Sequence, residues 1–168
     1  RARLAYDAPA LQRLRLLNRF FFQELGFGGN INNYYGVGNS YLHEVLATRR
    51  GIPITLAVLY IEFAQHVGLV ARGVSFPGHF LVKLRLPRGE VVVDPFVGQS
   101  LSRDELEERL GPYRQNRGLV GEFEAPLGLF LQSAPSRDIL ARMLRNLGEI
   151  HRATGDLARR LAVQQRLV

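Results

Sequence analysis

The chain has 168 residues, 46% of them hydrophobic, and a net charge of +7 from 22 Lys and Arg against 15 Asp and Glu. This length and composition suit one compact domain with at most a small appendage, and no apolar run is long enough to span a membrane. The sequence has no cysteine, which excludes disulfides, thiolate metal sites and a cysteine nucleophile, and which agrees with a cytoplasmic setting.

The basic residues do not form a nucleic-acid signature. They are spread over several predicted helices, and neither a zinc-finger spacing nor an RNA-binding aromatic motif is present. We therefore expect a solvated basic surface and no nucleic-acid partner.

The first half of the chain is predicted to be helical. Leucine and phenylalanine recur at helical spacing over residues 9–25, which predicts the first helix. A loop rich in Gly and Asn follows over 26–38; it lacks the Lys-Ser/Thr of a phosphate-binding loop and is interpreted as structural. Asn39 or Ser40 is expected to cap a second helix, which ends at residues 49–50.

The third predicted helix is the most apolar segment of the chain. Pro53 suits its first position, because proline has no N–H to leave unpaired and a preset φ, and Gly68 ends it. The residues between them are apolar nearly all round, so we expect this helix to lie buried at the centre of the domain.

Beyond this helix the pattern changes from helix to strand. Residues 70–76, 79–86 and 90–94 read as three strands, separated by Pro-Gly and Pro-Arg-Gly turns. A capping box predicts a short helix over 102–110, residues 111–135 read mostly as loop, and two helices are expected over 136–153 and 156–167. The pattern as a whole predicts an α+β fold with a helical half, a small antiparallel sheet and a C-terminal helical hairpin.

His79 and Asp94 are the candidate functional residues, since they stand at ends of neighbouring predicted strands. A hairpin around Arg88 and Gly89 pairs residues whose numbers sum to about 177, so that Asp94 faces Lys83. His79 then lies on the same face, four residues further along its strand and roughly 13 Å away. A bulge or a strong twist is needed to bring the two side chains together.

Four segments carry a resemblance to a known family: Leu25-Gly26-Phe27, Asn39-Ser40-Tyr41-Leu42, Arg50-Gly51-Ile52-Pro53-Ile54-Thr55-Leu56 and Phe76-Pro77-Gly78-His79-Phe80. In their order and spacing they are similar to the SirB-type bacterial proteins, in which a transglutaminase-like core precedes C-terminal tetratricopeptide repeats. The resemblance covers about residues 11–100. It implies a papain-like core with a buried central helix against a small antiparallel sheet.

The resemblance also implies a division of the chain and a site. Residues 1–132 are expected to form the transglutaminase-like domain and 133–168 to begin a tetratricopeptide-like region. Because the first residue is Arg1 and not Met, we also expect the chain to be a piece of a longer protein. In such a core a Cys at the start of the buried helix acts with a His and an Asp on neighbouring strands. Counting back fifteen residues from Gly68 places Pro53 at the nucleophile position and leaves His79 and Asp94 as the other two members.

Proline cannot act as a nucleophile, so the leading hypothesis is a non-catalytic regulatory or protein-interaction module. Its cleft, with His79, Asp94 and the aromatic neighbours Phe80 and Phe96, is expected to bind a peptide or to support the fold. No cofactor is expected.

Two alternatives stay open. One is a hydrolase or acyl-transferase that uses an unusual nucleophile, or water, with His79 and Asp94; Thr55 and Ser40 are the nearest hydroxyls in the sequence. The other is a metal site formed by the same pair with one of Glu44, Glu62 or His66, although no familiar ligand spacing is present.

Overall fold

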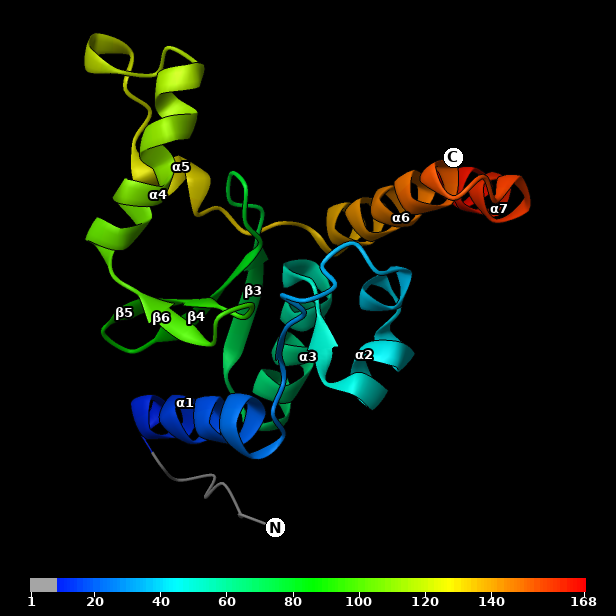
Figure 1. Ribbon diagram of the computed structural model, residues 1–168. Coiled ribbons are helices and arrows are strands. Elements are labelled where there is room, and N and C mark those ends of the chain that lie inside the picture. Colours follow the sequence, from blue (N-terminus) through cyan, green and yellow to red (C-terminus); the bar gives the residue numbers. More distant parts are fainter. Residues whose placement is uncertain (1–8) are drawn as a thin grey trace.

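A computed structural model describes residues 9–168, in which helices surround a small antiparallel sheet (Figure 1). The helices are α1 (Ala10–Asn18), α2 (Leu42–Thr48), α3 (Pro53–His66), α4 (Arg103–Asn116), α5 (Leu127–Phe130), α6 (Ser136–Ala153) and α7 (Leu157–Leu167). The sheet has the spatial order β3-β4-β5-β6, formed by Val70–Val74, Leu81–Leu86, Gly89–Asp94 and Gln99–Leu101. Helices and a small antiparallel sheet in this order agree with the α+β prediction.

The first predicted helix is present but changes its winding. After α1 the chain continues as a π-helical segment over Arg19–Glu24, which still presents a buried face. Phe21 on that segment is fully buried and stacks on Phe27, with ring centroids 4.5 Å apart. These aromatic contacts join the N-terminal helix to the core.

The loop over 26–38 contains two short elements. Strand β1 (Gly28–Gly29) pairs in parallel with β2 (Arg50–Gly51), and a 3₁₀ turn follows at Val37–Ser40. The prediction that Asn39 or Ser40 caps α2 is wrong, because both residues lie in this turn and Tyr41 precedes the helix. The buried Asn39 amide instead donates to two loop carbonyls, at 2.6 and 3.0 Å, which satisfies it within the loop.

Helix α3 is the buried central helix that its composition predicts. It begins at Pro53, and its extended N-cap residue is Ile52. Seven of its fourteen residues are buried, and it packs against β3 and β4. The remaining prediction, that Gly68 follows the helix, is confirmed by the positive φ of 73° at that glycine.

The turn of the β4–β5 hairpin lies one residue earlier in the chain than predicted. Leu86 pairs with Gly89, so the paired numbers sum to 175 and Lys83 faces Val92 instead of Asp94. The turn is made by Pro87 and Arg88. This agrees with the preference of proline for the first central position of a turn, here Pro87, and of glycine for the fourth residue, here Gly89.

The sheet divides two apolar clusters because its side chains alternate between faces. On one face, four strand residues and Phe80, which directly precedes β4, join α1 and α3 in the first cluster; the strand residues are Ala71, Val82, Leu84 and Val93. On the other face, strand residues and Phe76 of the β3–β4 loop pack against α4 and α5. The buried members of this second cluster are Val74, Phe76, Leu81, Val92, Leu106, Leu110 and Leu127.

The segment 111–135 is more ordered than the loop predicted for it. Helix α4 continues to Asn116 through Pro112, whose missing N–H would have bonded the carbonyl of the exposed residue Glu108. Arg114, on the last turns, is 6% exposed, pairs with Glu107 and donates to the carbonyl of Ala125 at 2.8 Å. These contacts hold the second half of α4 against the chain that follows it.

Helices α6 and α7 form the predicted antiparallel hairpin, which projects from one side of the molecule (Figure 1). The segment before α6 crosses the edge of β3, where the Ala134 N–H donates to the Gly73 carbonyl at 2.8 Å. Farther along α6, His151 Nε2 lies 3.3 Å from the Tyr41 hydroxyl. Within residues 9–168, no helix is both long and apolar enough to cross a bilayer.

Candidate functional site

His79 lies in the turn between β3 and β4, two residues before β4 begins. Gly78 has a φ of 71°, and the His79 N–H donates to the Phe76 carbonyl at 2.9 Å. The imidazole is partly buried, and its ring lies 6.2 Å from the Phe76 ring, which belongs to the second apolar cluster. The side chain therefore points to the face of the sheet that α4 covers.

Asp94 ends β5 and points to the same face. It follows Val92 by two residues, and Val92 packs in the second cluster. Its carboxylate is buried; one oxygen accepts the Phe96 N–H at 2.9 Å, and the other accepts Arg109 Nη1 at 2.7 Å. The backbone turn and a cation on α4 therefore satisfy this charge together.

Arg109 joins the two predicted residues. The nitrogen that binds Asp94 also lies 3.4 Å from His79 Nδ1. This arginine is not among the residues predicted from the sequence, although the capping box of α4 and its spacing from the buried Leu106 were signals that it lies on the sheet side of its helix. The guanidinium of Arg109 therefore lies between the His79 imidazole and the Asp94 carboxylate and contacts both.

The electrostatics of this cluster favour a neutral imidazole. Burial lowers the pKa of His79, the Arg109 cation lowers it further, and the Asp94 carboxylate opposes both. In a catalytic triad the carboxylate binds the imidazole directly and stabilises its protonated form. Here the carboxylate is engaged by Arg109, and a cation stands beside the imidazole.

The first turn of α3 lies on the other side of the sheet. Ile52 and Ile54, which flank Pro53, pack in the first apolar cluster, whereas His79 contacts Phe76 of the second. The sheet therefore separates the imidazole from the turn that the resemblance assigns to the nucleophile.

The two candidate hydroxyls have different surroundings. Thr55 is fully buried; its hydroxyl lies 2.8 Å from the Asn39 carbonyl and accepts the Ile52 N–H at 3.2 Å. These bonds fix the start of α3 to the preceding 3₁₀ turn. Ser40 lines a hollow above this start.

The proposed metal ligands are not gathered in one place. Among residues 9–168, no group of three or more His, Cys, Asp or Glu side chains is placed to hold a metal ion. Glu44 lies instead beside His43, 3.9 Å away.

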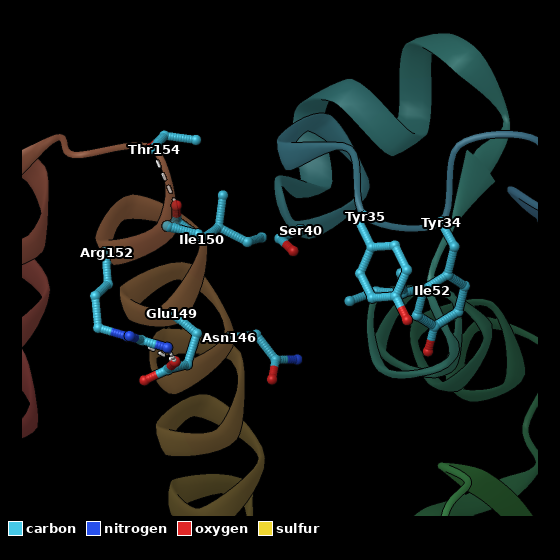
Figure 2. A pocket seen from close by; sticks show the side chains of 10 residues that line it. Tyr34, Tyr35, Ser40, Ile52, Asn146, Glu149, Ile150, Arg152 and Thr154 are labelled. Carbon is cyan, nitrogen blue, oxygen red and sulfur yellow. Dashed lines mark hydrogen bonds and ion pairs between the residues drawn. The ribbon is translucent and has the colours of Figure 1, made fainter.

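A hollow of about 570 Å³ lies between the N-terminal end of α3 and helix α6. Figure 2 shows Tyr34, Tyr35 and Ile52 on one wall and Asn146 and Ile150 of α6 on the other. Ser40 lies between the two walls, and Glu149 pairs with Arg152 at 2.8 Å on the α6 side.

The two tyrosines of this wall are not among the functional residues predicted from the sequence. Tyr35 is 88% exposed and Tyr34 is 43% exposed, and Tyr34 contacts Phe96 with ring centroids 5.8 Å apart. Two adjacent tyrosines in a loop rich in Gly and Asn were the available signal. Because α6 supplies the facing wall from more than 100 residues away, the sequence did not reveal the hollow.

Comparison with known proteins gives a family. The model of the transglutaminase-like superfamily matches residues 1–145. A UPF0162 protein of Xylella fastidiosa (strain 9a5c) is 45% identical over 145 residues, which cover 84% of this chain and 50% of that protein. A UPF0162 protein of Pseudomonas aeruginosa is 34% identical over 130 residues, 77% of this chain and 45% of that protein.

A more distant similarity covers a shorter segment. F-box only protein 21 of Homo sapiens is 40% identical over 72 residues, 43% of this chain and 12% of that protein. No solved structure matches. The chain spans about half the length of the bacterial relatives it matches, and on its family-model match it belongs to the transglutaminase-like superfamily.

Proposed function

We propose that this chain is a non-catalytic, cytoplasmic protein-interaction module that binds an extended peptide segment of a partner. The binding site is the hollow between α6 and the loop that carries Tyr34 and Tyr35. One observation carries the proposal: the hollow lies over the start of α3, where the resemblance places the nucleophile, and aromatic and aliphatic side chains supply half of its ten lining residues.

The chemistry around the hollow supports binding without catalysis. The chain has no cysteine, and Pro53 has neither a nucleophilic atom nor a backbone N–H. The Thr55 hydroxyl is occupied by backbone groups, and His79 faces the opposite side of the sheet. A nucleophile and its base must lie within hydrogen-bond reach of each other, and these residues do not.

The lining of the hollow indicates what kind of segment it accepts. Tyr34 and Tyr35 offer ring faces, and Ile52 and Ile150 offer aliphatic surface for an apolar side chain. Asn146, in the same hollow, can bond the peptide backbone. An apolar anchor on an extended backbone satisfies both kinds of group.

The test is selection of peptides from a random display library against the purified chain, followed by affinity measurement. We expect the selected peptides to share an apolar side chain that fills the hollow. Their affinity for Tyr35→Ala should be at least about tenfold lower than for the wild type, since the variant loses an aromatic contact. Because Tyr35 is 88% exposed, we expect the Tyr35→Ala variant to keep its fold.

Ile31→Ala is the matched control. Ile31 lies in the same loop and is 80% exposed, but it does not line the hollow. Selected peptides should bind this variant as they bind the wild type. A library that enriches no peptide, or peptides that bind both variants equally well, would contradict the proposal.

The catalytic alternative has a separate test. An acylating or fluorophosphonate probe should leave the wild-type chain unlabelled. Labelling that disappears in Ser40→Ala would establish a reactive hydroxyl in the hollow and would end the non-catalytic part of the proposal.

The α6–α7 hairpin belongs to the same proposal. We place the boundary of the transglutaminase-like domain at residue 132 and take 133–168 as the start of a tetratricopeptide-like region, as in SirB-type proteins. Its support is the antiparallel pair of helices, which carries the exposed leucines Leu140, Leu157 and Leu161.

A further inference from the structure

The face of the sheet that packs under α4 and α5 is only half covered. Toward the β4–β5 turn, the side chains of this face leave the second apolar cluster and become exposed or half-buried. They are Val70 and Arg72 on β3, Lys83 and Arg85 on β4, and Glu90 on β5. Strand alternation places all five on the same face as Val74, Leu81 and Val92.

Positive charge predominates on this open half of the face. Arg72 and Lys83 are direct cross-strand partners, and Arg85 follows Lys83 by two residues. Like charges directly opposite each other on a sheet destabilise it. Only one carboxylate offsets them here, that of Glu90, which lies 4.0 Å from Lys83 Nζ. Three cations against one carboxylate leave a local charge of +2.

These side chains enclose a hollow of about 250 Å³, with Ser133 at its edge. The Lys83 side chain is 18% exposed, whereas Arg72 and Arg85 are exposed residues. One guanidinium N–H of Arg72 donates to the Ala71 carbonyl at 3.2 Å. The other four N–H groups of this guanidinium can donate to a ligand.

We propose that this hollow is a second interaction site, which binds an acidic segment of a protein partner through its carboxylates. Arg72 and Arg85 supply planar donor groups that suit carboxylates, and Lys83 adds a third positive charge to the same hollow. The patch is confined to one small hollow and has no aromatic lining, whereas single-stranded nucleic acid requires a longer basic track with stacking surfaces.

This site is independent of the peptide cleft of the proposed function. The peptide cleft is the hollow at the start of α3, and one of its lining residues, Ile52, belongs to the first apolar cluster. The basic hollow lies on the other face of the sheet, which carries the second cluster. Variants at one site leave the other unchanged, so either proposal can fail alone.

The experiment compares two labelled peptides by fluorescence anisotropy, one of alternating Glu and Thr and one with Gln in place of each Glu. We expect the wild-type chain to bind the Glu peptide at least about tenfold more tightly than the Gln peptide. The double variant Arg72→Glu/Arg85→Glu should lose that difference, because two attractive pairs become repulsive. Both arginines are exposed, so the variant should fold; Arg72→Gln/Arg85→Gln gives a milder change at the same positions.

Arg15→Glu/Arg166→Glu is the matched control, with the same change in net charge at two exposed arginines elsewhere. It should bind the Glu peptide as the wild type does. Equal losses in both double variants, or no preference for Glu over Gln, would overturn the proposal. Tighter binding of a single-stranded DNA oligonucleotide would assign the hollow to nucleic acid. Self-association of the wild type that only Arg72→Glu/Arg85→Glu removes would assign it to a second copy of the chain.

Discussion

Asp94 carries a buried charge whose partners come from two different elements. Its side chain is 5% exposed, and the side chain of Arg109, which neutralises it, is 24% exposed. If a buried carboxylate loses its cation, nothing offsets the free-energy cost of removing its charge from water. Loss of the cation therefore lowers the free energy of unfolding by more than the intact ion pair adds to it. The pair is therefore a point where α4 is fixed to the end of β5.

We predict that Arg109→Met lowers the free energy of unfolding by about 2–4 kcal/mol at neutral pH. The methionine can still cover the apolar side of α4, but it leaves one Asp94 oxygen without a donor. Chemical denaturation monitored by circular dichroism measures the change. Arg103→Met, at an exposed position of the same helix, should cost less than about 0.5 kcal/mol.

The same variant should raise the pKa of His79. Burial and Arg109 both lower this pKa and Asp94 raises it, so loss of the cation leaves a carboxylate nearby with less opposition. An NMR titration of the histidine ring protons measures the pKa in both proteins. An unchanged His79 pKa, together with equal stability of the two methionine variants, would mean that Arg109 is not held in this cluster.

The lowered pKa also sets the sign of one pH dependence. The folded pKa of His79 lies below the unfolded value of 6.5, so folding disfavours the protonated ring. The contribution of this group to stability is therefore complete above pH 6.5 and is lost as the pH falls through the folded pKa.

At the scale of elements, the start of α3 is held by a side chain and not by a conventional cap. The Thr55 hydroxyl links the Ile52 N–H to the Asn39 carbonyl and so ties α3 to the 3₁₀ turn before α2. Gly51 permits this close packing, because a Cβ there would come within 2.8 Å of the same hydroxyl.

We predict that Thr55→Val destabilises the chain by about 1–3 kcal/mol, since valine has the same shape but leaves a buried N–H and a carbonyl unpaired. Thermal denaturation followed by circular dichroism measures the loss. Thr48→Val is the control, because Thr48 also bonds backbone groups but is exposed, and water can replace its hydroxyl. Similar losses in the two variants would remove Thr55 from this role.

Elements whose signals are local in sequence could be predicted. A proline at the start, a glycine after the end and an apolar surface all round predicted helix α3. The periodicity of apolar residues predicted α6 and α7. The register error in the β4–β5 hairpin was also local: Pro87 at the first central position of the turn would have indicated the right pairing.

The arrangement of the site could not be predicted in the same way. His79 and Asp94 were correctly expected on one face of the sheet, but which helix covers that face depends on how α4 folds back. The contact through Arg109 follows from that long-range packing. For the same reason, the hollow beside Tyr35 depends on α6, which no local pattern places there.

At the scale of the whole molecule, α6 connects the core to the C-terminal hairpin. Its N-terminal half lies against the core, where Arg142 donates to Ser75 at 2.7 Å, and its C-terminal half forms one wall of the peptide cleft. Helix α7 contacts α6, so its position depends on the α6–α7 interface. At that interface, Gly148 is buried and a Cβ there would lie 3.4 Å from Val163.

We predict opposite effects of two substitutions at Gly148. Alanine fits at van der Waals distance from Val163 and should stabilise α6 by about 0.5–1 kcal/mol through its higher helix propensity. Leucine overfills the interface and should raise hydrogen exchange in α7 about tenfold or more, at an overpacking cost of about 1–3 kcal/mol. Exchange in α3 should stay as in the wild type, because α3 lies in the core and not in the hairpin. Equal acceleration in α3 and α7 would mean that the hairpin and the core unfold as one unit, and that residues 133–168 do not form a separable region.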